Sequence, residues 1–131
     1  MPYNYKFPSD IREEELDQEK DDDLLLKILG DRTQESGGLT VMTPENEYYK
    51  KFKFHFKNGK LSGMQYVYNG DGDRVMSVQF VAGKRHGLYI RHHDNGVIAC
   101  CGTYKEGLPI GMWKFYDHNG EHTSTHKYTT K

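Results

Sequence analysis

Hydrophobic and polar residues alternate along most of the chain after residue 48. The clearest stretch is Phe52-Lys53-Phe54-His55-Phe56, in which every second side chain is aromatic. Side chains of a β-strand point alternately to the two faces of a sheet, so this pattern predicts an amphipathic strand. Similar stretches recur up to Tyr128 and are separated by glycine-containing turns. Residues 48–128 are therefore predicted to form one meander of about seven antiparallel strands.

The stretches repeat with a period of 24 residues. Glycines form three series in a single register, Gly59/Gly83/Gly107, Gly63/Gly87/Gly111 and Gly72/Gly96/Gly120. The unit is predicted to be a β-hairpin, because Asn-Gly, a pair that favours hairpin turns, stands at 58–59, 69–70, 95–96 and 119–120. A single hairpin is marginal in water, so neighbouring units must pair into one sheet. The predicted fold class is mainly β: a single-layer antiparallel meander of hairpin repeats, with a short N-terminal helix packed on the sheet.

This repeat resembles the MORN repeat family, and more closely its bacterial MORN-variant branch. Units of that branch read Gly-x-Trp-x-x-Tyr-Tyr and continue into an Asn-Gly turn. The segment Gly111-Met-Trp-Lys-Phe-Tyr116 with Asn119-Gly120 matches best, whereas Gly63-Met-Gln65 departs at the Trp position. The resemblance covers roughly residues 50–131. It implies a repeat scaffold that binds proteins, with an antitoxin-like or immunity-like role or contact with lipid as the expected functions.

Strict alternation assigns the strand residues to two faces. One predicted face is nearly continuous apolar surface and needs a cover in water; it holds Phe52, Phe54, Phe56, Met64, Tyr66, Tyr68, Met76, Val78, Phe80, Leu88, Ile90, His92, Cys100, Tyr104, Met112, Tyr116 and Tyr128. The other is predicted to be mixed, basic and partly aromatic, with Lys53, His55, Lys57, Gln65, Val67, Gln79, Tyr89, Arg91, His93, Thr103, Lys105, Trp113, Phe115 and Asp117.

The chain also divides by charge. Residues 1–47 carry 13 Asp/Glu and 5 Lys/Arg, a net charge of -8, and residues 48–131 carry 6 Asp/Glu and 13 Lys/Arg, a net charge of +7. Residues 1–47 are predicted to form an acidic arm with a short helix at 24–29 and a strand at 39–42, and residues 48–131 a MORN-like domain. Residues 10–23 are expected to be a charged helix or a disordered arm. The helix is expected to cover the apolar face, because a helix this short needs a surface to pack on.

Two sets of residues are candidates for binding. Tyr89, Arg91, Trp113 and Phe115, on the mixed face, are predicted to contact a partner protein, because exposed aromatic and Arg residues are frequent in interfaces; ordinary lateral packing between strands is the alternative. Lys51, Lys53 and Lys57 have two interpretations. They protect a sheet edge from aggregation, which is the preferred reading, or they contact anionic groups of a ligand.

Catalytic and metal-binding motifs do not stand out in the sequence. The seven histidines lack metal-site spacing, and the adjacent Cys100 and Cys101 point to opposite faces of a strand, so they are expected to be reduced thiols of a cytoplasmic protein. No enzyme activity, cofactor or metal is therefore predicted. The predicted function is binding of another protein, such as a toxin or a defence enzyme, as an antitoxin-type inhibitor or a phage counter-defence protein. The alternative is an adaptor for anionic lipid at a membrane surface; nucleic acid is not the expected ligand.

Overall fold

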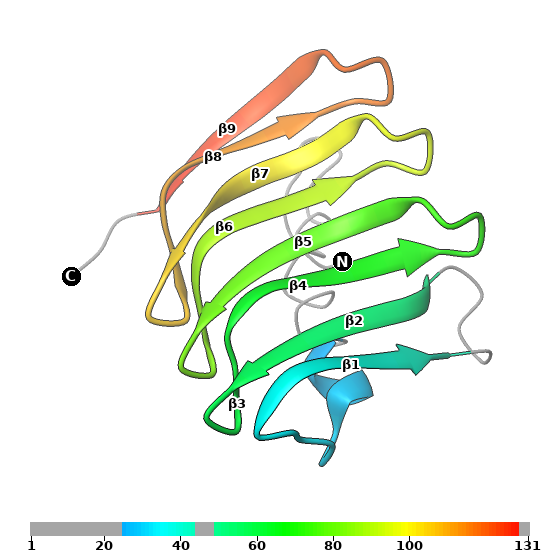
Figure 1. Cartoon of the computed structure of the whole chain (residues 1–131). Helices are drawn as coiled ribbons and strands as arrows, with labels where there is room; N and C mark the ends of the chain where they lie inside the picture. The colour runs from blue at the N-terminus through cyan, green and yellow to red at the C-terminus, as the bar shows by residue number, and fades with distance from the viewer. Residues whose placement is uncertain (1–24, 44–48, 129–131) are drawn as a thin grey trace. The chain divides into compact units, whose positions relative to one another are not determined.

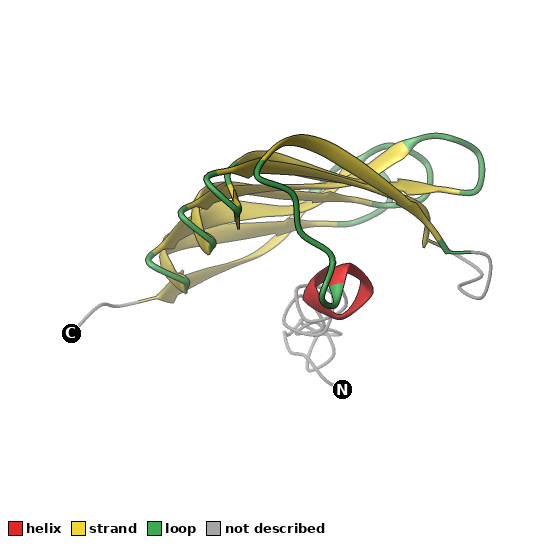
Figure 2. Ribbon diagram, turned by 60° about the horizontal axis from the view of Figure 1, so that its bottom comes forward, coloured by secondary structure: helices red, strands yellow, loops and turns green. Residues whose placement is uncertain are grey.

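The computed structural model describes residues 25–43 and 49–128. It divides the chain into two units, Met1–Arg32 and Thr33–Lys131. The described part of the second unit is one antiparallel sheet whose strands follow one another in chain order (Figure 1). These strands are β1 (Ser36–Met42), β2 (Tyr49–Lys57), β3 (Lys60–Leu61), β4 (Gly63–Asn69), β5 (Arg74–Val81), β6 (Lys84–His92), β7 (Ile98–Lys105), β8 (Leu108–Tyr116) and β9 (His122–Tyr128). The predicted single-layer meander is confirmed, and Figure 2 shows the layer curved and nearly edge-on.

β1 belongs to this sheet and not to the N-terminal unit. It pairs with β2 over its whole length, from Ser36 opposite Lys57 to Met42 opposite Lys51. The predicted strand at 39–42 therefore exists and begins three residues earlier. In the first unit, a helix spans residues 25–29 and ends as predicted at Gly30, whose positive φ is that of a glycine C-cap. The predicted packing of this helix on the sheet stays a prediction, and residues 10–23 lie outside the described residues.

Two-residue turns connect consecutive strands at one of the two ends of the hairpins. Their central pairs are Asn58-Gly59, Ala82-Gly83 and Glu106-Gly107, and both residues of each pair have positive φ, between 51° and 90°. This is the type I′ geometry, which matches the twist of the flanking strands. Only the first of these three turns has the predicted Asn-Gly pair. Ala82 and Glu106 occupy the same position with side chains that tolerate it less well.

The other three Asn-Gly pairs lie in longer turns at the opposite ends of the strands. In each of these turns, the N–H of the first residue donates to the carbonyl of the fifth: Asn69 to Asp73, His93 to Val97 and Asp117 to Glu121. The Asn69 and Asp117 side chains also accept two backbone N–H bonds each from within their turns. The residue with positive φ is the glycine at 72, 96 or 120. The prediction of a turn at these sites is right, but the predicted two-residue geometry is wrong.

Bulges recur with the 24-residue period. Val78 pairs with Tyr89 and Phe80 with Arg85, so Gln79 alone faces residues 86–88. Gly87 lies within this bulge at φ 107°, a conformation that only glycine adopts without strain. A second series places one extra residue on a strand at Val75, Ala99 and Thr123, as the register shifts there show. These bulges break strict alternation locally, and as a result the consecutive residues Val75 and Met76 are both buried.

Neighbouring hairpins are also joined by hydrogen bonds at the ends that carry the two-residue turns. The N–H of each turn glycine donates to a carbonyl of the preceding segment: Gly59 to Glu35, Gly83 to Leu61 and Gly107 to Arg85, at 2.8–2.9 Å. These bonds satisfy turn groups that would otherwise depend on water. Each hairpin is therefore positioned by its neighbour at the turn as well as along the strand ladder.

The predicted division of residues between the two faces is right for β2, β5 and β7 and wrong for β4, β6 and β8. The two-residue turn pairs Lys57 with Lys60, so even-numbered residues of β2 lie beside odd-numbered residues of β4, as Phe52 lies beside Val67. We call one face the aromatic face; it holds Phe52, Phe54, Phe56, Gln65, Val67, Met76, Val78, Phe80, Tyr89, Arg91, Cys100, Tyr104, Trp113 and Phe115. We call the other the cationic face; it holds Lys51, Lys53, Tyr66, Tyr68, Ser77, Leu88, Ile90, Cys101, Met112, Lys114 and Lys127.

The two-residue turns give a direct test of this register. Ala82 has φ 51° where the preceding hairpin has Asn58. Because left-handed backbone costs alanine more than asparagine, Ala82→Asn is expected to raise the free energy of unfolding by about 0.5–1 kcal/mol. Urea denaturation measures it. Ala82→Ser, which adds a polar group without this backbone preference, is the control, and destabilisation by Asn would contradict the turn geometry.

Candidate cationic binding surface

The aromatic residues predicted to face a partner are core residues. Tyr89 and Trp113 are 0% exposed and Phe115 is 6% exposed. They lie on the aromatic face together with Phe52 and Phe54, because Val78 pairs with Tyr89 and Cys100 with Phe115. The prediction that they form a solvent-facing surface is therefore wrong. The alternative, packing between neighbouring strands, describes Tyr89 and Trp113 correctly. Arg91 lies on the same face, opposite Met76 and Cys100.

Trp113 is the centre of this packing. Its ring centroid lies 5.3 Å from that of Tyr89, 5.2 Å from that of Tyr104 and 5.8 Å from that of Tyr128. The indole also lies over Gly102 on the neighbouring strand, where any side chain would overlap the ring. Aromatic pairs at these distances add stability beyond area burial. Gly102 thus makes room for Trp113 in the single layer.

Gln65 occupies the position equivalent to Tyr89 and Trp113, and it is also fully buried. Its amide oxygen accepts from the His55 N–H at 2.6 Å, and its nitrogen donates to the carbonyls of Ser62 and Gly63. Trp113 makes the corresponding bond, from its indole nitrogen to the Ile110 carbonyl. Both side chains donate a hydrogen bond to the backbone carbonyl three residues earlier, that of Ser62 or Ile110. Gln65 therefore keeps the same backbone contact as Trp113 at the equivalent position of the repeat.

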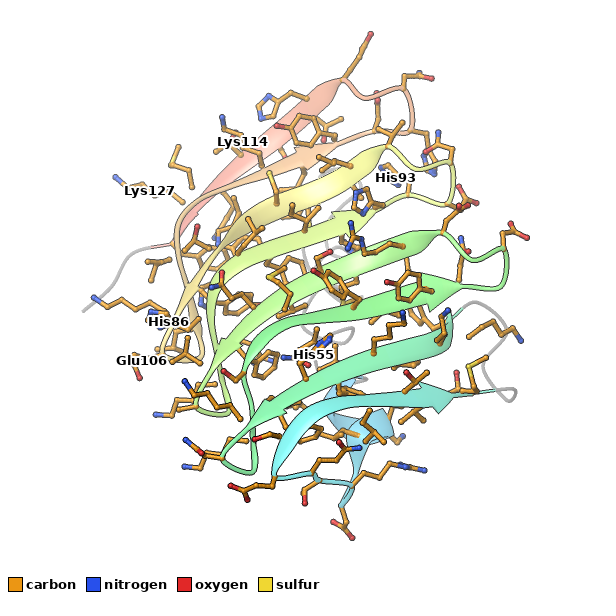
Figure 3. The ribbon with its side chains drawn as sticks, in the orientation of Figure 1. His55, His86, His93, Glu106, Lys114 and Lys127 are labelled. Carbon is orange, nitrogen blue, oxygen red and sulfur yellow. The ribbon has the colours of Figure 1, made fainter. Side chains whose placement is uncertain are left out.

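Charge is distributed unevenly between strands and turns. The nine strands contain twelve Lys/Arg residues and no Asp or Glu. Both Lys and Asp/Glu are disfavoured in strands, so intrinsic preference does not explain this bias. The register assigns nine of the twelve cations to the cationic face: Lys51, Lys53, Lys57, Lys60, Arg74, Lys84, Lys105, Lys114 and Lys127. Figure 3 shows two of them, Lys114 and Lys127, on the adjacent strands β8 and β9.

Lys51, Lys53 and Lys57 all lie on the cationic face. The preferred interpretation of these lysines, protection of a sheet edge, does not fit the structure, because β2 is paired with β1 on one side and with β3 and β4 on the other. The alternative interpretation, contact with an anionic ligand, stays a prediction. Lys51 and Lys53 both lie over the ring of Tyr68, at 4.8 and 5.5 Å from its centroid. Strict alternation predicts Tyr68 on the face opposite to Lys53, and the observed register contradicts this.

Besides Met42 (62% exposed) and Ile98 (38%), which lie toward the longer turns, four large apolar side chains are exposed at one end of the cationic face. They are Val81 (50% exposed), Leu88 (43%), Leu108 (68%) and Met112 (56%). Val81 pairs with Lys84, Leu108 with Lys105 and Met112 with Lys127, so three of these four residues have a lysine beside them. All belong to the half of the sheet nearer the two-residue turns. Apolar side chains grouped among cations are typical of a binding surface.

In the described part of the sheet unit, the Asp and Glu residues lie outside the strands, in the turns and, for Glu35, just before β1. Asp71, Asp73, Asp94, Asp117 and Glu121 are in the longer turns of one edge, where Figure 3 also shows His93. Glu106 and His86 lie at the opposite edge (Figure 3), where the Glu106 N–H donates to His86 and its carboxylate lies 3.8 Å from Lys84 Nζ. The two faces between these edges receive their charge from lysine and arginine alone.

His93 and His118 connect two of the longer turns. Their rings stack with centroids 4.0 Å apart. His93 Nε2 lies 2.8 Å from the Tyr116 carbonyl and therefore carries the proton that it donates. Asn95 donates to the His118 carbonyl beside this stack. Burial lowers the pKa of His93, and the charge of His118 lowers it further. Burial and then the Arg74 charge lower the pKa of His92.

The cysteines are free, as predicted. Cys100 is buried on the aromatic face, and Cys101 lies on the cationic face opposite Lys114. Burial raises the pKa of Cys101 despite the Lys114 charge, so its thiol is protonated at neutral pH and is a weak nucleophile. Among the described residues, no three His, Cys, Asp or Glu side chains are grouped as metal ligands. The described part of the chain also contains no helix with the length and hydrophobicity to cross a membrane.

Comparison of the chain with family models, curated proteins and solved structures gave no match.

The aromatic packing predicts the effect of removing the indole. Trp113→Ala should lower the free energy of unfolding by about 3–5 kcal/mol, as loss of a buried aromatic ring does. Met112→Ala, next to it on the exposed face, should change it by less than about 0.5 kcal/mol. Urea unfolding of both variants is the measurement. If the Trp113→Ala protein is as stable as the parent, Trp113 is not a core residue and is again a candidate for contact with a partner.

The histidines predict how stability depends on pH. The pKa values of His92 and His93 are lower in the folded chain than in the unfolded chain, so the unfolded state binds more protons. Stability should therefore be constant at high pH and fall as the pH drops below about 6.5, the unfolded value. His93→Asn, which introduces the residue that the first longer turn has at Asn69, should flatten this dependence. An equally steep loss in the variant would mean that other groups cause it.

Proposed function

We propose that the protein is a non-enzymatic binding module that recognises an acidic protein through its cationic face. The observation that carries this proposal is the charge of the strands, with twelve Lys/Arg and no Asp/Glu, nine of the cations being on one face. Like charges on one surface repel each other, and an anionic partner removes that repulsion. Such a surface also accelerates association with a partner of opposite charge.

The exposed apolar residues support a protein as this partner. Met112 and Leu88 give the face a contact area that does not depend on charge, and Tyr66 and Tyr68 add aromatic surface that is partly exposed. Methionine and tyrosine are enriched in protein interfaces. An interface that combines exposed apolar side chains with cations fits an acidic protein surface with its own apolar residues.

The class of partner rests on the resemblance of the repeat to the bacterial MORN-variant branch. It supports a toxin or a defence enzyme as the partner, with this chain as an antitoxin-type or immunity-type inhibitor, or a phage counter-defence protein. This part of the proposal is an analogy between folds, so the surface and not the fold has to be tested. The reduced thiols are compatible with a cytoplasmic partner.

An anionic lipid surface is the second candidate. The observation that favours it is the group Val81, Leu88, Leu108 and Met112, exposed among Lys84, Lys105, Lys114 and Lys127. Peripheral proteins bind bilayers by inserting a few apolar side chains and by attracting anionic headgroups with lysines. In this case Leu88→Ser with Met112→Ser should weaken sedimentation with phosphatidylserine vesicles and leave binding to an acidic peptide unchanged.

The first proposal is tested by titration of the full chain with poly-L-glutamate, followed by NMR. Amide shifts should be concentrated on cationic-face residues and should weaken with added salt. Lys114→Gln with Lys127→Gln should raise the dissociation constant by about threefold or more, since exposed ion pairs contribute up to about 1 kcal/mol each.

The control for this titration is Lys27→Gln, which removes one charge outside the sheet. Its dissociation constant should remain close to that of the parent. If Lys27→Gln weakens binding as much per charge as the double variant, net charge and not the cationic face determines binding, and the proposal fails.

A further inference from the structure

Three cations gather on two tyrosine rings at one end of the cationic face. Lys51 and Lys53 from β2 lie over the Tyr68 ring at 4.8 and 5.5 Å, and the Arg74 guanidinium from β5 lies over the Tyr66 ring at 4.5 Å. The register brings them together, because Lys51 pairs with Tyr68, Lys53 with Tyr66, and Tyr68 with Arg74. We call these five residues the Lys–Tyr cluster. Three neighbouring strands, β2, β4 and β5, supply it.

The cluster holds its cations with rings and not with carboxylates. In the described ranges, 25–43 and 49–128, the ion pair of the sheet is Lys84–Glu106, at the two-residue turns. A ring face attracts a cation but adds no negative charge, so the three positive charges still repel each other. An ammonium or guanidinium group on a ring also has N–H donors on its other sides. The cluster therefore presents both positive charge and hydrogen-bond donors.

We propose that the Lys–Tyr cluster is a subsite for a phosphorylated side chain of the protein partner, an inference that rests on the proposed function. A phosphomonoester carries about two negative charges near neutral pH and three acceptor oxygens, which suits three cations better than one carboxylate does. Arginine binds phosphate oxygens with two parallel N–H bonds, and the lysines add point charges. Tyr66 and Tyr68 limit the movement of all three.

His92 provides a sensor for this anion. Its pKa is lowered by burial and by the Arg74 charge, so the group is sensitive to charge at the cluster. A dianion bound at Arg74 offsets that charge. The pKa of His92 should therefore rise when an anion binds at the cluster. A substitution that only destabilises the protein would not raise this pKa in the folded state.

The surroundings of the cluster favour a protein side chain over a bilayer. Asp71 and Asp73 lie in the turn between β4 and β5, and Asp73 directly precedes Arg74. A flat anionic membrane would bring its headgroups against these carboxylates, whereas one phosphorylated side chain reaches the cluster without covering the turn. Four of the exposed apolar residues that a bilayer would take up, Val81, Leu88, Leu108 and Met112, lie in the half of the face nearer the two-residue turns, and Met42 lies beside Lys51 of the cluster.

The test uses the full chain and two blocked peptides that differ at one residue, Ala-Ala-phosphoserine-Ala-Ala and Ala-Ala-Glu-Ala-Ala. Dissociation constants are measured from amide shifts. The phosphopeptide is expected to bind at least about fivefold more tightly than the Glu peptide, because of its second charge and additional acceptors. Lys53→Gln and Arg74→Gln should each raise its dissociation constant about fivefold. The His92 pKa, followed by its ring proton shifts, should rise on binding.

Lys27→Gln is the matched control, since it removes one lysine outside the sheet and outside the cluster. Phosphopeptide affinity should be unchanged in this variant. Equal affinity for the two peptides, or equal losses from Lys53→Gln and Lys27→Gln, would overturn the inference. Binding of phosphatidic acid vesicles without any binding of the phosphopeptide would also overturn it. Failure here with continued binding of poly-L-glutamate by the cationic face would leave the proposed function standing.

Discussion

A two-residue turn pairs the residue before it with the residue after it, and this constraint decides which side chains of the sheet share a face. At Asn58-Gly59 it sets Lys57 opposite Lys60 and Phe56 opposite Leu61. Each later hairpin of the same type repeats the arrangement, with Val81 opposite Lys84 and Lys105 opposite Leu108. The aromatic core and the cationic face both follow from this pairing, since a register shifted by one residue would mix them. Positive φ at both turn residues is therefore required by the whole sheet.

The repeat and the meander could be predicted from sequence because they depend on local signals. Glycine spacing gives the period, and the alternation of apolar and polar residues, clearest in Phe52-Lys53-Phe54-His55-Phe56, identifies the strands. The pairing between strands needs the turn type, which the sequence suggests for Asn58-Gly59 but hides at Ala82-Gly83 and Glu106-Gly107. The predicted faces grouped Tyr66, Leu88 and Ile90 with the core on hydrophobicity alone, and the register places them on the cationic face.

The candidate surface was only partly predictable for the same reason. Lys51, Lys53 and Lys57 could be selected because one strand carries them all. The contribution of Arg74, Lys114 and Lys127 depends on pairings between strands that lie far apart in sequence. Tyr89 and Trp113 look like interface residues in the sequence, because aromatic residues are common both in cores and in interfaces. Gly102, which receives the Trp113 ring, shows in the structure which of the two applies.

The bonds between successive turns have a consequence for the size of the binding surface. Each hairpin contacts the next by the same strand pairing and by one glycine N–H to carbonyl bond, as from Gly83 to Leu61 and from Gly107 to Arg85. Related chains could therefore gain or lose one 24-residue unit without disturbing the others. Because two strands advance the sheet by about 10 Å, the length of the cationic surface would change in steps of that size. If the cationic face binds a partner as proposed, the number of repeats would set the length of the partner surface that it can contact.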